Sequence, residues 1–137
     1  MSANSFFDTN IFLYADDTRF PDKQKKAVDL IEEHWRNGSA TISLQILQEY
    51  FHGATSKLSL PVEKAREKVE LISAFRLAIL RPPDLLSAID IHRLHKISFW
   101  DALVVRAAQQ TGCRVLFSED MQQGRDFDGV RVVNPFQ

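Results

Sequence analysis

The stretch SFFDTN at residues 5–10 decides the fold of this chain of 137 residues. Its first three residues are short and mostly apolar, which predicts a buried strand, and its last three suit the start of a helix. We therefore expect a strand that ends at Phe7 and a helix that runs to Tyr14. A strand that leads directly into a helix is the first unit of an α/β fold.

The same alternation continues along the chain. Further helices are expected from Pro21 to a stop at Asn37-Gly38, after a capping Ser43, from Pro61, and over residues 85–95 and 99–111. Further short strands are expected at residues 40–42, 77–80, 115–117 and 130–133, the last as an edge strand. Strands that alternate with helices predict right-handed crossovers and a parallel sheet covered on both faces, here in a single domain of residues 1–137.

Composition limits the classes of protein to consider. The 17 basic and 18 acidic side chains nearly cancel, so no strong overall field draws the chain to nucleic acid or to an anionic membrane. The lone Cys113 cannot form an internal disulfide, the first residues lack a signal-peptide pattern, and no apolar run approaches the roughly 20 residues of a membrane span. We expect a cytoplasmic protein with no membrane partner, which holds any polyanion through local patches or bound cations.

Acidic residues at predicted strand and helix ends form the candidate functional set. Asp8 follows the first strand and Asp120 follows the strand at residues 115–117, and ligands of open α/β sheets bind beyond the carboxyl ends of the strands. Asp101 lies in the first turn of a helix on its apolar face, and Glu49 flanks the apolar face of another helix.

Several carboxylates in one cleft repel each other unless a cation neutralises them. Oxygen ligands without His or Cys favour magnesium or manganese over zinc. Such ions activate water and stabilise charge on a phosphate oxygen, so hydrolysis of a phosphodiester by a metal-activated water fits this set.

Each acid also has an ordinary structural interpretation. Asp8 suits a helix cap, Ser98-x-x-Asp101 matches a capping box, Glu49 alone suits an exposed helix position and Asp120 a turn. Only the four together favour a functional site.

Other polar and aromatic residues are interpreted first as structural. The basic residues of two helices are expected to form solvated faces, although RNA phosphates are an alternative partner: Lys23, Lys25, Lys26, Arg36, Arg93 and Lys96. His92 and His95 lack a third soft ligand. Trp100 either stacks on a base or, more commonly for an aromatic at a helix start, packs. An apolar set is compatible with a contact to a second copy or to a partner protein and equally with ordinary core: Leu44, Ile46, Tyr50 and Leu58.

Read together, four segments resemble the PIN domain, and in particular the VapC-like toxins of type II bacterial toxin–antitoxin systems. They are FFDTN at residues 6–10, Glu49, SFWDAL at residues 98–103 and LFSED at residues 116–120. The likeness spans nearly the whole chain, from Phe6 to VNPF at residues 133–136. It implies a three-layer, Rossmann-like PIN fold with four or five parallel strands, a homodimer, and magnesium- or manganese-dependent cleavage of RNA.

The resemblance also implies roles for individual residues. The family's acids correspond to Asp8 and Asp101 as central metal ligands, with Glu49 and Asp120 completing the site. The supporting positions correspond to Thr9, Asn10 and Ser118. Glu119 stands beside Asp120, so which of the two is the better ligand stays open. The resemblance further implies an antitoxin whose peptide crosses the cleft and presents a basic residue to the acids.

Two other classes of protein stay open. A non-catalytic PIN-like module that binds RNA or protein is usually marked by the loss of an acid, and all four acids are present here. An aspartyl-phosphate protein, either a receiver domain or a haloacid-type phosphatase, also places an Asp after the first strand. The phosphatase needs a second Asp two residues later, where this chain has Asn10.

Overall fold

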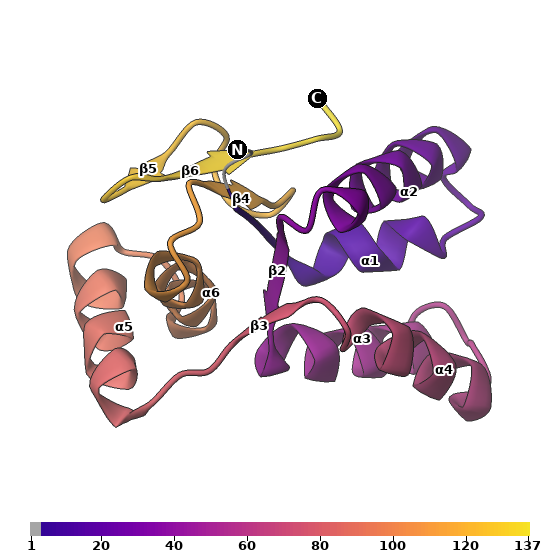
Figure 1. Cartoon of the computed structure of the whole chain (residues 1–137), viewed down its shortest axis with the longest axis horizontal. Coiled ribbons are helices and arrows are strands. Elements are labelled where there is room, and N and C mark those ends of the chain that lie inside the picture. The colour runs from indigo at the N-terminus through magenta and orange to yellow at the C-terminus, as the bar shows by residue number, and fades with distance from the viewer. Residues whose placement is uncertain (1–3) are drawn as a thin grey trace.

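A computed structural model describes residues 4–137, in which six strands form one sheet flanked by six helices (Figure 1). The strands are β1 (Ser5–Phe7), β2 (Ala40–Ser43), β3 (Arg76–Ala78), β4 (Val115–Phe117), β5 (Asp126–Phe127) and β6 (Val130–Val133). The helices are α1 (Thr9–Ala15), α2 (Pro21–Arg36), α3 (Leu44–Ser56), α4 (Val62–Ile72), α5 (Pro82–His95) and α6 (Phe99–Gln110). This alternation confirms the α/β fold class.

The sheet has the strand order β3-β2-β1-β4-β6-β5. Every neighbouring pair is parallel except β5 and β6, so five strands are mutually parallel, as predicted. The prediction that residues 130–133 form an edge strand is wrong, because β5 lies outside β6 and pairs with it in antiparallel register. A strand of two residues is too short to show a hydrophobic period.

The strand order reverses at β1, which lies between β2 and β4. Figure 1 shows α1 to α4 on one side of the sheet and α5 and α6 on the other. In such a doubly wound sheet the chain leaves the central strand in opposite directions, and a crevice opens beyond the carboxyl ends of the two strands at the reversal. The ends of β1 and β4 are therefore where a site is expected.

Packing beneath this edge is aromatic and close. The rings of Phe7 and Phe117 lie 5.2 Å apart between centroids, and Phe6 is fully buried. Helix α3 approaches α1 at Gly53, where a Cβ atom would lie 2.9 Å from Cδ1 of Leu13. This close approach brings one face of α3 against α1.

Element boundaries near β3 differ from expectation. The strand occupies Arg76–Ala78 rather than residues 77–80, and α5 begins at Pro82 rather than at Leu85. Proline is favoured in the first turn of a helix because its missing N–H has no partner there. The Asp84 carboxylate also accepts a hydrogen bond from the Arg81 N–H at 2.9 Å, which caps the new start.

One expectation on α3, the capping by Ser43, is wrong, and for two residues of its apolar set the structure decides between the two open interpretations. Ser43 occupies the N-cap position but makes no capping bond, and its buried hydroxyl has no partner in the described chain. Ile46 and Tyr50 are fully buried and belong to the core, whereas Leu44 is 59% exposed. Among residues 4–137, no helix has the length and apolar character to cross a membrane.

Candidate active site

Asp8 stands at the junction of β1 and α1 and is 6% exposed. One carboxylate oxygen accepts a hydrogen bond from the Thr9 N–H at 2.8 Å, as expected of a helix cap. The other accepts from the hydroxyl of Ser118, the residue after β4, at 2.7 Å. Asp8 is therefore a cap and also a carboxylate held in one orientation at the carboxyl ends of β1 and β4.

Glu49 is tied to the first turn of α1. Its Oε1 accepts a hydrogen bond from the Thr9 hydroxyl at 2.8 Å. Gln45, one turn earlier on α3, donates from Nε2 to Oε2 of Glu49 at 3.4 Å and to the Trp100 carbonyl at 3.2 Å. The amide of Gln45 thus bridges α3 to the start of α6.

Asp120 and Glu119 have different environments, although they are neighbours in sequence. Asp120 accepts a hydrogen bond from Nδ2 of Asn10 at 2.9 Å. Glu119 accepts from the Tyr14 hydroxyl at 2.7 Å and pairs with Nζ of Lys23 at 2.6 Å. Because Lys23 neutralises Glu119, Asp120 is the better placed of the two as a cation ligand.

Asp101 lies in the first turn of α6, whose N-cap is Ser98. The Ser98 hydroxyl accepts a hydrogen bond from the Asp101 N–H at 3.0 Å. This is one half of the predicted capping box, the bond from the Asp101 N–H to the Ser98 hydroxyl. The Asp101 side chain lines the cleft with the other acids.

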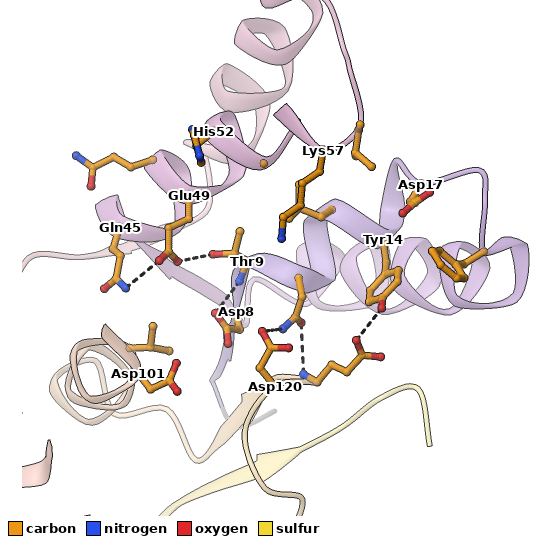
Figure 2. A pocket seen from close by; sticks show the side chains of 18 of the residues that line it. Asp8, Thr9, Tyr14, Asp17, Gln45, Glu49, His52, Lys57, Asp101 and Asp120 are labelled. Atoms are coloured by element: carbon orange, nitrogen blue, oxygen red, sulfur yellow. Dashed lines mark hydrogen bonds between the residues drawn. The ribbon is translucent and has the colours of Figure 1, made fainter. Parts of the chain in front are cut away.

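One cleft of about 680 Å³ brings the candidate residues together (Figure 2). Its lining contains all four predicted acids together with Thr9, Asn10 and Glu119. Ser118 is fully buried behind the cleft and acts on it only through Asp8. Figure 2 shows Asp8 in the middle of the cleft floor, with Glu49, Asp101 and Asp120 around it.

The acids carry negative charge without a compensating cation. Burial raises the pKa of Asp8 to about 6, and the nearby carboxylates of Asp120 and Glu49 contribute to the rise. Burial, with the same two neighbours, also raises the pKa of Asp101. Among residues 4–137, no Lys, Arg or His forms an ion pair with any of the four.

The donor set fits a hard divalent cation in chemical type, because carboxylate oxygens predominate and the cleft has surplus negative charge. Within the described chain, however, no group of three or more His, Cys, Asp or Glu side chains lies close enough together to hold an ion. The four acids share a cleft rather than a ready-made coordination shell.

Sequence reasoning missed several residues of the cleft. Gln45, Tyr14 and Lys57 line it, and Lys23, expected on a solvated face, instead pairs with Glu119 96 positions away. The neighbouring Lys25 does lie on a solvated face, paired with Asp29 one turn along α2. Charge on a helix does not distinguish these two lysines, because their partners are decided by the tertiary fold.

Comparison with known proteins agrees with this architecture. The sequence pattern described as the PIN domain matches residues 5–127. No curated protein matches the chain.

Three solved structures share the fold. A toxin–antitoxin complex from Klebsiella pneumoniae has a TM-score of 0.69 at 20% identity, covering 96% of this chain and 98% of that one. VapC20 from Mycobacterium tuberculosis, described as a toxin that cleaves the sarcin-ricin loop, has a TM-score of 0.64 at 17% identity, covering 85% and 92%. VapBC2 from Rickettsia felis, bound to a DNA fragment from its promoter, has a TM-score of 0.60 at 21% identity, covering 85% and 87%. The family match over most of the chain, together with these folds, shows that this protein belongs to the PIN domain family.

Proposed function

We propose that this chain is a metal-dependent endoribonuclease that uses Asp8, Glu49, Asp101 and Asp120. The observation that carries the proposal is the convergence of these four carboxylates in one cleft without a compensating cation. Structural acids in proteins are usually paired or solvated, whereas Asp8 is buried with two other acids near enough to raise its pKa.

Asp8 and Asp101 are the proposed central ligands of a Mg²⁺ or Mn²⁺ ion, with Asp120 and Glu49 as outer members of the set. When bound, such an ion acidifies a coordinated water and stabilises charge on a phosphate oxygen. The positive charge of the ion would also offset the repulsion between the four acids and a polyanionic substrate.

The neighbouring side chains orient these acids. Ser118 and the Thr9 N–H hold both oxygens of Asp8, so the carboxylate does not rotate away from the cleft. The Thr9 hydroxyl holds Glu49, and Asn10 holds Asp120. One turn of α1 therefore positions three of the four acids, which reduces the reorganisation that binding requires.

The test is cleavage of total cellular RNA by wild type and Asp8→Asn, with Mg²⁺, with Mn²⁺ and with chelator. We expect cleavage by the wild type that needs the metal and is absent in Asp8→Asn. Asp90→Asn is the matched control, because this acid lies on α5 outside the cleft. Equal activity of Asp8→Asn would identify a contaminating nuclease and contradict the proposal.

The second candidate function is binding of RNA or protein without hydrolysis. The presence of all four acids in one cleft disfavours it, since such a module has no need to keep them. An inactive wild type that still binds RNA under every metal condition would establish this alternative instead.

We further propose that the chain is the toxin of a cytoplasmic toxin–antitoxin pair and is a homodimer. The support for the pairing is its fold likeness to a toxin–antitoxin complex and to VapBC2, and the homodimer rests on the resemblance to the VapC-like toxins. Expression with and without the protein encoded by the adjacent reading frame tests the pairing, with growth arrest expected only when the chain is expressed alone. Light scattering of the purified chain tests the dimer.

A further inference from the structure

Trp100 is an exposed aromatic that directly precedes Asp101; Asp101 lines the acidic cleft, and Trp100 lies outside the lining. It is 63% exposed, and its ring contacts only that of Phe99, at 5.3 Å between centroids, among the aromatic pairs of residues 4–137. The other tryptophan, Trp35, is also half exposed, but it stacks on Phe75 at 5.0 Å with an angle of 25° between the rings. Trp35 therefore has a packing role, and the indole of Trp100 has none that the fold requires.

The backbone of Trp100 is held at one end of the cleft. Its carbonyl accepts the hydrogen bond from Gln45, and its neighbour Asp101 lines the cleft. The N-cap bond from Ser98 fixes the same turn of α6. These bonds fix the backbone that carries the exposed indole, which reduces the entropy lost when a flat ligand stacks on it.

A positive charge lies at the other end. Lys57 follows the last residue of α3, lines the cleft, and in Figure 2 extends into it. It forms no ion pair within the described chain. Gln45 and Lys57 are 12 positions apart along α3 and its C-cap, so the span between them is about 18 Å at about 1.5 Å per residue.

Helix α3 therefore runs from Gln45, which is bonded to the backbone of Trp100 at the start of α6, past Glu49 to Lys57. A nucleic-acid strand laid along the cleft would meet an aromatic platform on one side of the acids and a phosphate contact on the other. Stacking on an exposed indole requires a base that has left its own helix, because bases inside a duplex present only their edges.

We propose that Trp100 stacks an unpaired base of the substrate and that Lys57 contacts a phosphate on the opposite side of the scissile bond. The inference rests on the proposed function of the cleft and adds the residues that select a single-stranded segment. It makes Trp100 a specificity residue and leaves the cation chemistry to the four acids.

The experiment uses the double variant Trp35→Phe and Asp8→Asn. The first substitution leaves Trp100 as the sole source of indole emission, because the chain has two tryptophans. The second prevents cleavage of the RNA during the titration. A short oligouridylate and a duplex of the same length are titrated in Mg²⁺ while indole emission is followed. We expect saturable quenching by the single strand and little by the duplex.

Binding measured by anisotropy of a labelled oligouridylate then compares variants. Trp100→Ala should weaken binding roughly 5- to 150-fold, the range expected for the loss of one stacked base, and Trp100→Phe should recover part of it. Lys57→Met should lower the slope of log affinity against log salt by about 0.7. Lys25→Met, whose lysine pairs with Asp29 outside the cleft, is the matched control and should leave the slope unchanged.

The outcomes separate this inference from the proposed function. Equal quenching by duplex and single strand, or unchanged binding by Trp100→Ala, overturns the inference even if the wild type cleaves RNA. If the wild type shows the expected stacking and salt dependence but cleaves no RNA, the inference is supported and only the proposed nuclease function is overturned. Absence of quenching by either probe overturns the inference and points to a protein partner for the indole.

Discussion

Replacing Asp8 by Asn should stabilise the metal-free protein at neutral pH while it abolishes activity. The asparagine oxygen still accepts from the Thr9 N–H, and its amide group donates to Ser118, whose hydroxyl also accepts. Asn and Asp are about equally good helix caps. The substitution therefore removes a buried charge and leaves the local hydrogen bonds in place.

The size of the effect follows from the pKa of Asp8. Burial raises this pKa from 3.8 to about 6. Each unit of pKa corresponds to about 1.4 kcal/mol in the free energy of ionising the carboxyl group. Below pH 3.8 the carboxyl is protonated in both folded and unfolded states and has no effect. As pH rises toward 6, only the unfolded state loses its proton, so unfolding becomes easier, by at most about 3 kcal/mol above pH 6.

Urea unfolding in chelator from pH 4 to pH 8 measures this difference. We expect wild type and Asp8→Asn to agree at pH 4 and to differ increasingly up to about pH 6, with the variant more stable. Adding Mg²⁺ should stabilise the wild type and not the variant, since a ligand stabilises only the state that binds it. A difference that does not change with pH, or a less stable variant at pH 7, would refute the assignment of Asp8 as a buried, uncompensated acid.

The remaining predictions concern stability and use the same urea titration. Ser98→Ala removes the cap of α6 and should lower the free energy of unfolding by about 1 kcal/mol. Ser43→Ala deletes a buried hydroxyl without a partner and should cause no loss, so equal losses for the two serines would contradict the hydrogen-bond assignments. Arg106→Met removes the 2.9 Å ion pair with Asp84 and should cost about 2 to 3 kcal/mol. The Arg81 N–H and the Arg106 side chain lower the pKa of Asp84, so Asp84→Asn should cost most at neutral pH and least near pH 3; a loss independent of pH would contradict this.

The local pattern of the chain was sufficient to predict most elements of the fold. Buried strands such as β1 and β4 are short apolar runs, and helices such as α6 carry their own cap and stop residues. These signals are local because secondary structure depends on periodicity over a few residues. The parallel sheet followed from the alternation of such elements.

The prediction was wrong where local signals were weak or had two meanings. The two residues of β5 are too few for a period, so residues 130–133 were assigned to the edge. Pro82 and Pro83 signal both the end of a strand and the first turn of a helix, and here they begin α5. A serine before a helix usually caps it, but the Ser43 hydroxyl makes no capping bond to α3.

The sequence by itself determined the identity of the four acids and their positions after predicted strands or on predicted helices, and from these it predicted a shared cleft and a hard cation. The tertiary structure alone decided which groups meet there. Ser118 reaches Asp8, and Asn10 reaches Asp120, each across 110 positions of the chain. Lys23 takes Glu119 out of the acidic set, and Gln45 ties α3 to α6 beside an exposed Trp100. Such pairings depend on how helices and strands pack in space, and no spacing along the chain encodes them.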